Sequence, residues 1–277
     1  MRILAAVIIF NSDYDLLREN ISKYIYDVEQ TVVWDNSIGQ RATLNRRWLN
    51  SNFPKAVYMT DGENVGIAKA LNKVSCYADK NNFDVLLTMD DDSVFDDFKS
   101  YHQRAVKEWE TNGLSIISPT VNVSRRENLQ NYVLIDDAIT SGMLVPLTIL
   151  KAVGGYEEKF FLEAIDVDLC YNARRHGYKV LADSSALLLQ RYGKPVHVKL
   201  LGHDMPYNDY APSRLYAVFR NHIYLCKRYH WPKSLLWKIF RQYFIGLVLR
   251  STLLGGNNSM DKFKAAFRGT ADGIKMK

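Results

Sequence analysis

Short apolar runs alternate with longer amphipathic segments through the first ninety residues of the chain. Residues 2–10 (RILAAVIIF) form a continuous run rich in β-branched side chains, as in a strand that is buried on both faces. The polar residues at 11–13 can cap a helix that follows them. The pattern predicts strands over 2–10, 31–34, 56–59 and 85–89, and helices over 14–26, 44–50 and 66–80.

This alternation predicts an α/β domain with a largely parallel sheet, because parallel strands need crossover connections. Each predicted strand ends in a polar cluster, at 11–13, 35–37, 60–64 and 90–92. Ligands of open α/β sheets bind beyond the carboxyl ends of the strands, where such loops gather. A ligand site is therefore expected at that edge.

Beyond residue 110 the pattern is less regular, and no internal repeat is visible. From residue 214 onward the chain is helical in pattern, aromatic and basic. The remaining predicted strands cover 114–117, 132–135, 139–145 and 178–183, and the remaining helices cover 147–153 and 166–177.

Composition narrows the class of protein. The 277 residues are 47% hydrophobic and 24% charged, which allows a sizeable core and excludes general disorder. Cys76, Cys170 and Cys226 are widely spaced and odd in number, so we expect buried free thiols in a reducing compartment. The apolar start is too short for a signal peptide, and the run at 243–249 is too short to span a bilayer. We expect a cytoplasmic protein that is soluble or peripherally membrane-bound.

Three adjacent carboxylates, Asp90, Asp91 and Asp92, follow the apolar strand VLLTM. Like charges this close are costly unless a cation is present, and Mg²⁺ or Mn²⁺ prefers oxygen ligands. Alternate side chains of a strand share a face, so Asp90 and Asp92 can point into one site. The alternative is an acidic cap for a helix after Ser93. Taken alone, the two interpretations weigh about equally.

Other polar clusters have structural alternatives as well. Asp35 and Asn36 can bind a nucleobase edge or a ribose, or they can form an Asx-turn. The segment 64–68 (NVGIA) allows close approach of a ligand, but Asn64 can also cap a helix. The apolar stretch 160–169 carries Glu163, Asp166 and Asp168, which suits a general base with a raised pKa or the solvated start of a helix.

In this order and spacing, the clusters resemble those of the family 2 glycosyltransferases, and most closely those of bacterial rhamnosyltransferase-like members. The resemblance covers about residues 1–230. The matching pieces are VIIFN (7–11), VVWDNS (32–37), ENVGIAKALN (63–72), LLTMDDDS (86–93), TSGMLVP (140–146), GGYEEKFFLEAIDVDLCYNARRHGYKV (154–180) and SRLYAVFRNHIYLCKRY (213–229).

The resemblance implies a GT-A fold, a nucleotide-diphosphate-sugar donor, and Mg²⁺ or Mn²⁺. It divides the chain into a catalytic domain over 1–212, with a nucleotide-binding half (1–110) and an acceptor half (111–212), and a helical extension over 213–277. It assigns metal binding to Asp90 and Asp92 and general base catalysis to Asp166. The remaining roles are donor binding for Phe10, Asn11, Asp35, Asn36, Asn64, Gly66, Ala68, Asn72, Asp90 and Asp91, and acceptor binding for Ser141, Gly142, Glu163 and Asp168.

One piece departs from the family. Related enzymes often have His-x-x-Gly after the last core strand, where this chain has Gln190-Arg191-Tyr192-Gly193. Either His197 or His203 replaces that histidine, or the metal has no such ligand. The donor is expected to carry deoxythymidine diphosphate, with uridine-diphosphate sugars, including galactofuranose, left open.

The partners expected are this donor and a saccharide or lipid-linked acceptor used in cell-surface polysaccharide synthesis. The aromatic and basic run at 230–254 suits a helix lying on an anionic membrane, or a helix packed on the core or on another copy of the chain. A net charge of +6 does not indicate nucleic acid by itself, and the acidic strand ends argue against it. Two other classes remain open, a non-catalytic sugar-nucleotide-binding protein and a nucleotidyltransferase, although the loop at 10–13 lacks the Gly-rich triphosphate-binding pattern of the latter.

Overall fold

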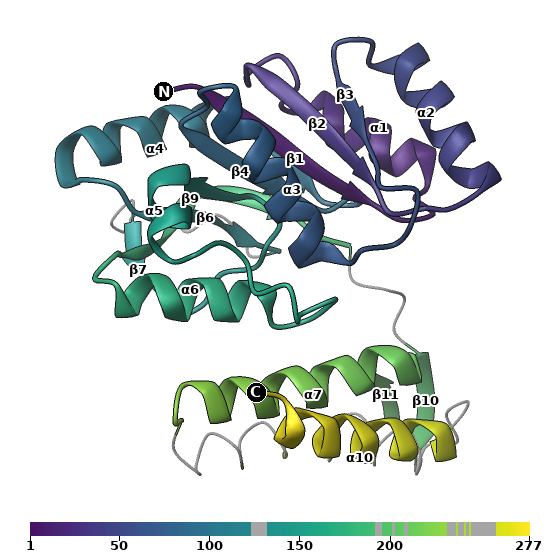
Figure 1. The fold of residues 1–277 in the computed structure, drawn as a ribbon. Coiled ribbons are helices and arrows are strands. Elements are labelled where there is room, and N and C mark those ends of the chain that lie inside the picture. Colours follow the sequence, from purple (N-terminus) through teal and green to yellow (C-terminus); the bar gives the residue numbers. More distant parts are fainter. Residues whose placement is uncertain are drawn as a thin grey trace. The chain divides into compact units, whose positions relative to one another are not determined.

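The computed structural model describes residues 1–122, 132–191, 196–200, 203–207, 210–231, 237, 241, 244 and 259–277 (Figure 1). The chain forms two compact units. The N-terminal unit comprises Met1–Phe161 and Ile165–Arg191, and the C-terminal unit comprises Leu162–Ala164 and Tyr192–Lys277. The units divide after Arg191, earlier than the expected start of the extension at 213, and three residues from the middle of the chain belong to the C-terminal unit.

Nine of the described strands form one sheet in the order β3-β2-β1-β4-β8-β6-β9-β5, with β7 pairing to β9. The half β3-β2-β1-β4 is parallel, as the alternating pattern predicts, and the other half is mixed. The strands are β1 (Ile3–Ile9), β2 (Gln30–Asp35), β3 (Val57–Met59), β4 (Val85–Met89), β5 (Val94–Phe95), β6 (Ile116–Val121), β7 (Tyr132–Leu134), β8 (Met143–Pro146) and β9 (Val180–Leu189).

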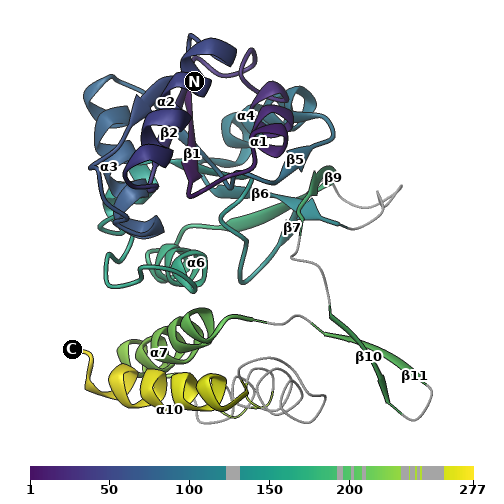
Figure 2. The same cartoon turned by 90° about the vertical axis from the view of Figure 1, so that its right-hand side faces the viewer.

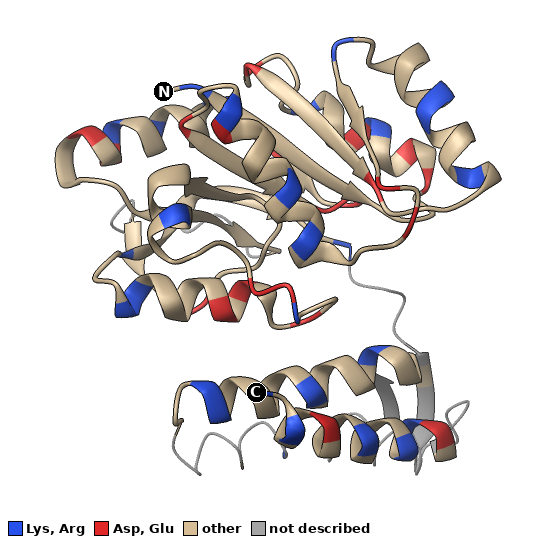
Figure 3. Cartoon of the chain, in the orientation of Figure 1, with Lys and Arg blue, Asp and Glu red and all other residues tan. Residues whose placement is uncertain are grey.

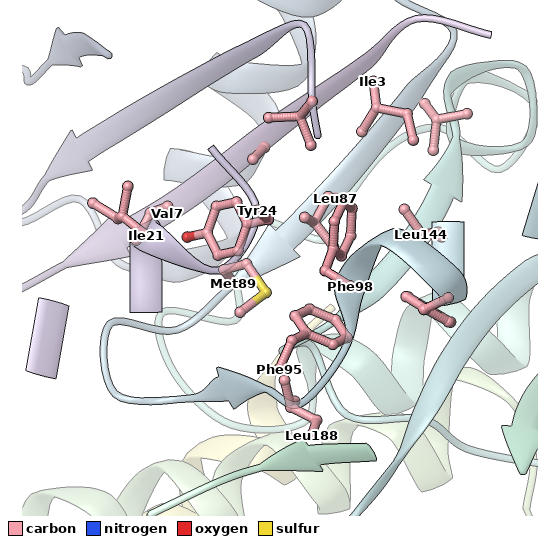
Figure 4. Close-up of a cluster of buried hydrophobic side chains, with 14 of the residues drawn as sticks. Ile3, Val7, Ile21, Tyr24, Leu87, Met89, Phe95, Phe98, Leu144 and Leu188 are labelled. Carbon is pink, nitrogen blue, oxygen red and sulfur yellow. The ribbon is translucent and has the colours of Figure 1, made fainter. Parts of the chain in front are cut away.

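Helices cover both faces of this sheet (Figures 1 and 2). Alternate residues of β1, such as Ile3 and Val7, pack against α1 and α4 in the main core, where Tyr24 and Phe98 meet (Figure 4). The helix α3 contacts β1, β2 and β4 from the opposite face. The helices of this unit are α1 (Tyr14–Ser22), α2 (Gln40–Asn52), α3 (Ile67–Lys80), α4 (Phe98–Asn112), α5 (Leu147–Ala152) and α6 (Ile165–Arg175).

Several elements differ from the sequence prediction. The helix α1 ends at Ser22, four residues before the predicted end at 26. The helix α4 was expected only as the helix after Ser93 in the capping alternative, and β9 extends well past the predicted end at 183. Among the free cysteines, Cys170 and Cys226 are buried as expected, whereas Cys76 is exposed because it faces outward on α3.

The C-terminal unit contains an antiparallel pair, β10 (Val196–Leu200) and β11 (His203–Tyr207), and two described helices, α7 (Pro212–Arg228) and α10 (Ser259–Lys275). These helices pack together through Leu215, Phe219 and Ala266. Most of the aromatic and basic run at 230–254, like Tyr192 and Gly193, lies outside the described residues. Among the described residues, no helix combines the length and apolar character needed to cross a bilayer.

Candidate active site

The parallel strands bring several of the predicted site residues to one edge of the sheet. Ile9 pairs with Asp35 at the ends of β1 and β2, and Val7 pairs with Met89, the last residue of β4. Phe10 follows β1 and is 53% exposed, and the backbone N–H of Asn11 donates to Ser37 Oγ at 2.8 Å. The loops after β1, β2 and β4 therefore adjoin one another, as expected.

The triple-aspartate loop, residues 90–93, is fixed by side chains from two other parts of the chain. The buried amide of Asn20 on α1 donates to the carbonyl oxygens of Asp90, at 2.9 Å, and of Ser93. Ser141 Oγ accepts the backbone N–H of Asp90 at 3.1 Å. These contacts fix the backbone of the loop from which the three carboxylates project.

Burial makes ionisation of two of the three carboxylates unfavourable. Burial raises the pKa of Asp91 above its usual value, opposed by a hydrogen bond that Ser12 donates to its carboxylate. Burial also raises the pKa of Asp92, the negative charge of Asp91 raises it further, and Arg191 opposes the shift. A bound cation would remove this cost because it stabilises the ionised form.

The capping alternative for the three aspartates is wrong. After Ser93 the chain forms β5, and the next helix, α4, takes its N-cap from Asp97, whose side chain accepts the N–H of Ser100 at 3.0 Å. Across the described ranges, no group of three or more His, Cys, Asp or Glu side chains converges closely enough to hold a metal alone. Two hard oxygen ligands still fit Mg²⁺ or Mn²⁺, because such ions commonly take one or two carboxylates plus substrate phosphates.

Gln190, at the position where related enzymes often have histidine, contacts the same loop. Its Nε2 donates to Asp90 Oδ2 at 3.2 Å, and its Oε1 is buried with no hydrogen-bond partner among the described residues. The side chain of Asn122 holds the backbone of Gln190 through bonds of 2.8 and 3.0 Å. His197 and His203 lie in β10 and β11 of the C-terminal unit, and a metal-binding role for either stays a prediction.

Asp35 is fully buried and its carboxylate is satisfied by the protein. Oδ1 accepts the backbone N–H of Ser37 at 2.7 Å, which is the expected Asx-turn, and Oδ2 accepts Asn45 Nδ2 at 2.9 Å and Tyr58 Oη at 2.8 Å. The side chain of Asn36 is buried and bonds Trp34 Nε1 at 3.0 Å and Val65 N at 3.2 Å. A role of Asp35 and Asn36 in donor binding stays a prediction.

A cleft of about 460 Å³ lies beside this cluster, at the ends of β2 and β3. Tyr58 lines it, and so does Thr60, whose hydroxyl donates to the Asp35 carbonyl at 2.7 Å. Asp35 therefore shapes the cleft through these two side chains. The other lining residues are Trp34, Arg46, Met59, Asp61 and Lys73.

The segment 64–68 packs closely against Phe161. Asn64 Oδ1 accepts the N–H of Gly66 at 3.1 Å, so Asn64 forms a turn and does not cap α3, whose N-cap is Gly66. Gly66 has φ of 81°, and a Cβ there would lie 2.6 Å from the Phe161 ring. Ala68 is buried in the first turn of α3.

Asn72 and Gly142 each contact a part of the chain that is distant in sequence. Asn72 Nδ2 donates to Tyr156 O at 2.9 Å and its Oδ1 accepts Tyr156 N at 2.9 Å, which ties α3 to the turn before residue 160. Gly142 has φ of 81°, and a Cβ would lie 2.7 Å from Pro119 Cγ. Contacts of Asn72, Gly142 and Ser141 with donor or acceptor stay predictions.

The Glu163 loop, residues 162–164, leads directly into α6. Glu163 and Ala164 both have φ of 66°, a conformation that costs non-glycine residues about 1–3 kcal/mol each. The buried Asn221 of α7 stabilises it by donating to the carbonyls of Leu162 at 2.6 Å and Glu163 at 2.8 Å. The Glu163 carboxylate also pairs with Arg214 at 2.5 Å.

Two acidic residues occupy the first turn of α6. Asp166 is partly exposed, and its Oδ1 accepts the N–H of Val167 at 2.9 Å, whereas Asp168 is only 3% exposed. Asp166 is thus accessible, as a general base requires. The start of α6 also agrees with the structural alternative, because a helix N-terminus favours carboxylates.

Asn20 and Asn221 were not identified from the sequence. Each occupies a position where its helix buries apolar side chains, beside Leu17 and Ile21 in α1 and beside Val218 and Leu225 in α7. A buried asparagine in an apolar stripe is the sequence signal, since such a group must find hydrogen-bond partners.

The sequence profile of Glycosyl transferase family 2 matches residues 5–164, more than half of the chain, and the match includes the triple-aspartate loop. The chain belongs to this family. RfbF of Shigella flexneri, a dTDP-rhamnosyl transferase, is 23% identical over 206 residues, which make up 74% of this chain and 64% of that protein. The family 2 chain therefore spans less than two thirds of the length of that relative.

Solved structures give this family 2 glycosyltransferase a GT-A fold. GalNAc-T7 with UDP, GalNAc and Mn²⁺ superposes with a TM-score of 0.61 at 12% identity, over 82% of this chain and 48% of that one. S. aureus TarS 1–349 in complex with UDP-GlcNAc gives a TM-score of 0.59 at 13% identity, over 99% of this chain and 81% of that one. The fold is thus the one that the sequence predicts.

Proposed function

We propose that this glycosyltransferase moves a sugar from a nucleotide-diphosphate-sugar to an acceptor hydroxyl in a single inverting displacement. The observation that carries the proposal is the triple-aspartate loop. Its backbone is fixed by Asn20 and Ser141 at the carboxyl edge of the parallel strands, and burial disfavours ionisation of Asp91 and Asp92. A pre-positioned anionic site of this kind suits a cation that carries a diphosphate.

Asp90 and Asp92 would hold Mg²⁺ or Mn²⁺, with Gln190 beside Asp90. When bound, the ion neutralises charge that develops on the leaving diphosphate. Mn²⁺ accompanies UDP in the GalNAc-T7 structure, which supports this assignment. Phe10 and Asn11 lie at the exposed end of β1, where they can contact the donor.

The nucleoside is proposed to occupy the cleft beside Tyr58 and Thr60, which Asp35 holds in place. Arg46 and Lys73 also line this cleft, and Lys73 pairs there with Asp61 at 3.2 Å. The similarity to a dTDP-rhamnosyl transferase supports a deoxythymidine-diphosphate donor and transfer of rhamnose.

Asp166 is proposed as the general base. The acceptor hydroxyl gives its proton to the Asp166 carboxylate while its oxygen attacks the anomeric carbon, and the bond to the diphosphate breaks with its electron pair. Ser141, Gly142, Glu163 and Asp168 would form the acceptor side. We propose a saccharide or lipid-linked acceptor and a role in cell-surface polysaccharide synthesis at the inner face of the cytoplasmic membrane.

Donor binding in the Asp92→Asn variant tests this proposal. Titration calorimetry with dTDP-rhamnose and UDP-sugars, with Mn²⁺ or with a chelator, should give metal-dependent binding in the wild type and about 100-fold weaker binding in the variant. The control is Glu110→Gln, an exposed carboxylate on α4, which should bind as the wild type does. Donor binding by Asp92→Asn that equals wild type in the presence of Mn²⁺, or wild-type binding that the chelator leaves unchanged, would refute the metal assignment.

A further inference from the structure

The helix α10 has one face fixed against α7. A Cβ on Gly269 would lie 2.5 Å from the carbonyl oxygen of Tyr216, and one on Gly273 would lie 2.5 Å from that of Arg220. The two backbones can approach this closely only because glycine has no side chain. The opposite face of α10 must therefore point away from α7.

That outer face carries an apolar stripe. Met260, Phe267 and Ile274 are 67%, 65% and 59% exposed. They are spaced seven residues apart, and a helix drifts by ~20° per seven residues, so the three side chains fall within ~40° of one another. Single exposed apolar side chains are ordinary, whereas these three recur every two turns over ~21 Å of one helix.

Basic residues border the stripe. Lys264, Arg268 and Lys275 are exposed on α10, and Arg268 lies over the ring of Tyr216 at 4.8 Å. Helices α7 and α10 together carry eight lysines and arginines and two aspartates, and blue segments are prominent on both (Figure 3). Of the two aspartates, Asp272 accepts a hydrogen bond from Tyr216 at 3.0 Å.

We propose that this face of α10 docks on an anionic phospholipid membrane. Met260, Phe267 and Ile274 enter the boundary between headgroups and acyl chains, and Lys264, Arg268 and Lys275 contact lipid phosphates. An apolar stripe with a cationic border matches such a surface in both polarity and charge. The same unit exposes 61% of Trp237, and tryptophan favours the membrane interface. The ring of Phe267 also meets the ring of Phe244 edge-on, with the ring centroids 6.1 Å apart.

Vesicle flotation of the full-length protein tests the proposal without donor or acceptor, so its outcome is independent of the proposed sugar transfer. Vesicles of phosphatidylcholine with phosphatidylglycerol should bind the protein, and phosphatidylcholine alone should bind it much less. Phe267→Ser with Ile274→Ser should weaken binding by about tenfold or more. Reversing the charges with Lys264→Glu, Arg268→Glu and Lys275→Glu should remove the preference for phosphatidylglycerol.

Leu134→Ser is the matched control, because Leu134 is 67% exposed on β7 of the other unit and should not affect binding. Thermal melts should show that all variants fold, since every substituted side chain is exposed. Failure to float with anionic vesicles would overturn the proposal, and so would equal binding by the stripe variants. A dimer in analytical ultracentrifugation that the stripe variants dissociate, with no vesicle binding, would assign this face to a second copy of the chain.

Discussion

The triple-aspartate loop and the Glu163 loop are stabilised by the same kind of hydrogen bonding, but they differ in backbone conformation and in charge. In each, a buried asparagine from a helix donates both hydrogens of its amide to two loop carbonyls, Asn20 from α1 and Asn221 from α7. In the first loop, burial and then the neighbouring charge of Asp91 raise the pKa of Asp92, so its charged state is costly. In the second, Glu163 has a cationic partner, Arg214, and the cost lies in left-handed backbone. The triple-aspartate loop therefore favours binding of a cation, whereas the Glu163 loop is held in one backbone conformation.

The largest expected effect comes from the residue that follows the Glu163 loop. Asp166→Asn should lower kcat by ~10²–10⁴-fold, because an amide cannot accept the acceptor proton. Donor affinity, measured by calorimetry with Mn²⁺, should stay unchanged. Loss of donor binding in a folded variant would instead place Asp166 in the donor site.

The two asparagines offer a direct comparison. Asn20→Ala and Asn221→Ala each leave two loop carbonyls without a donor, and each should lower the free energy of unfolding by about 1–3 kcal/mol. Asn20→Ala should weaken donor binding. Asn221→Ala should spare donor binding and raise KM for the acceptor.

Asn112→Ala is the control for both variants, because Asn112 is an exposed asparagine on α4 that bonds only Glu108 among the hydrogen bonds described. Chemical denaturation and calorimetry on the three variants give the comparison. If both buried-site variants lost donor binding equally, the two loops would not act separately.

A smaller effect is expected at Arg214, which is about half exposed at 48%. Arg214→Ala should raise KM for the acceptor by about fivefold, since a partly exposed ion pair contributes about 1 kcal/mol or less. Arg214→Lys should restore most of the affinity. An unchanged KM in steady-state kinetics would show that the ion pair does not position Glu163.

The smallest effect concerns the charge of the triple-aspartate loop. Burial raises the pKa of Asp91, so the ionised carboxylate destabilises the folded state at neutral pH relative to the unfolded chain. Asp91→Asn should therefore raise the melting temperature of the metal-free protein by about 2 °C or less. Below the usual range of aspartate pKa values, both proteins should melt together, because the wild-type carboxylate is then protonated.

The sequence predicts the triple-aspartate loop because its members are adjacent and follow a mostly apolar strand. It also predicts the parallel half of the sheet, where short apolar runs alternate with helical patterns. The hydrogen-bond partners of Asn20 and Asn221 cannot be predicted from the sequence, because they lie at least 70 residues from Asn20 and at least 58 residues from Asn221. The predicted strand ends at Asp183, whereas β9 continues to Leu189. Ser184 and Ser185 interrupt the apolar pattern at the point where the register with β6 shifts.

The hydrogen bonds of the two loops also set an order of assembly during synthesis. Asn20 precedes the carbonyls that it binds, so this partner is already synthesised when the triple-aspartate loop leaves the ribosome. The Glu163 loop must wait for Asn221, which is made about 60 residues later. At ~5–20 residues per second, the nascent chain spends several seconds with the Leu162 and Glu163 carbonyls lacking this donor. Translation of the C-terminal unit is therefore the step that completes the loop leading to Asp166.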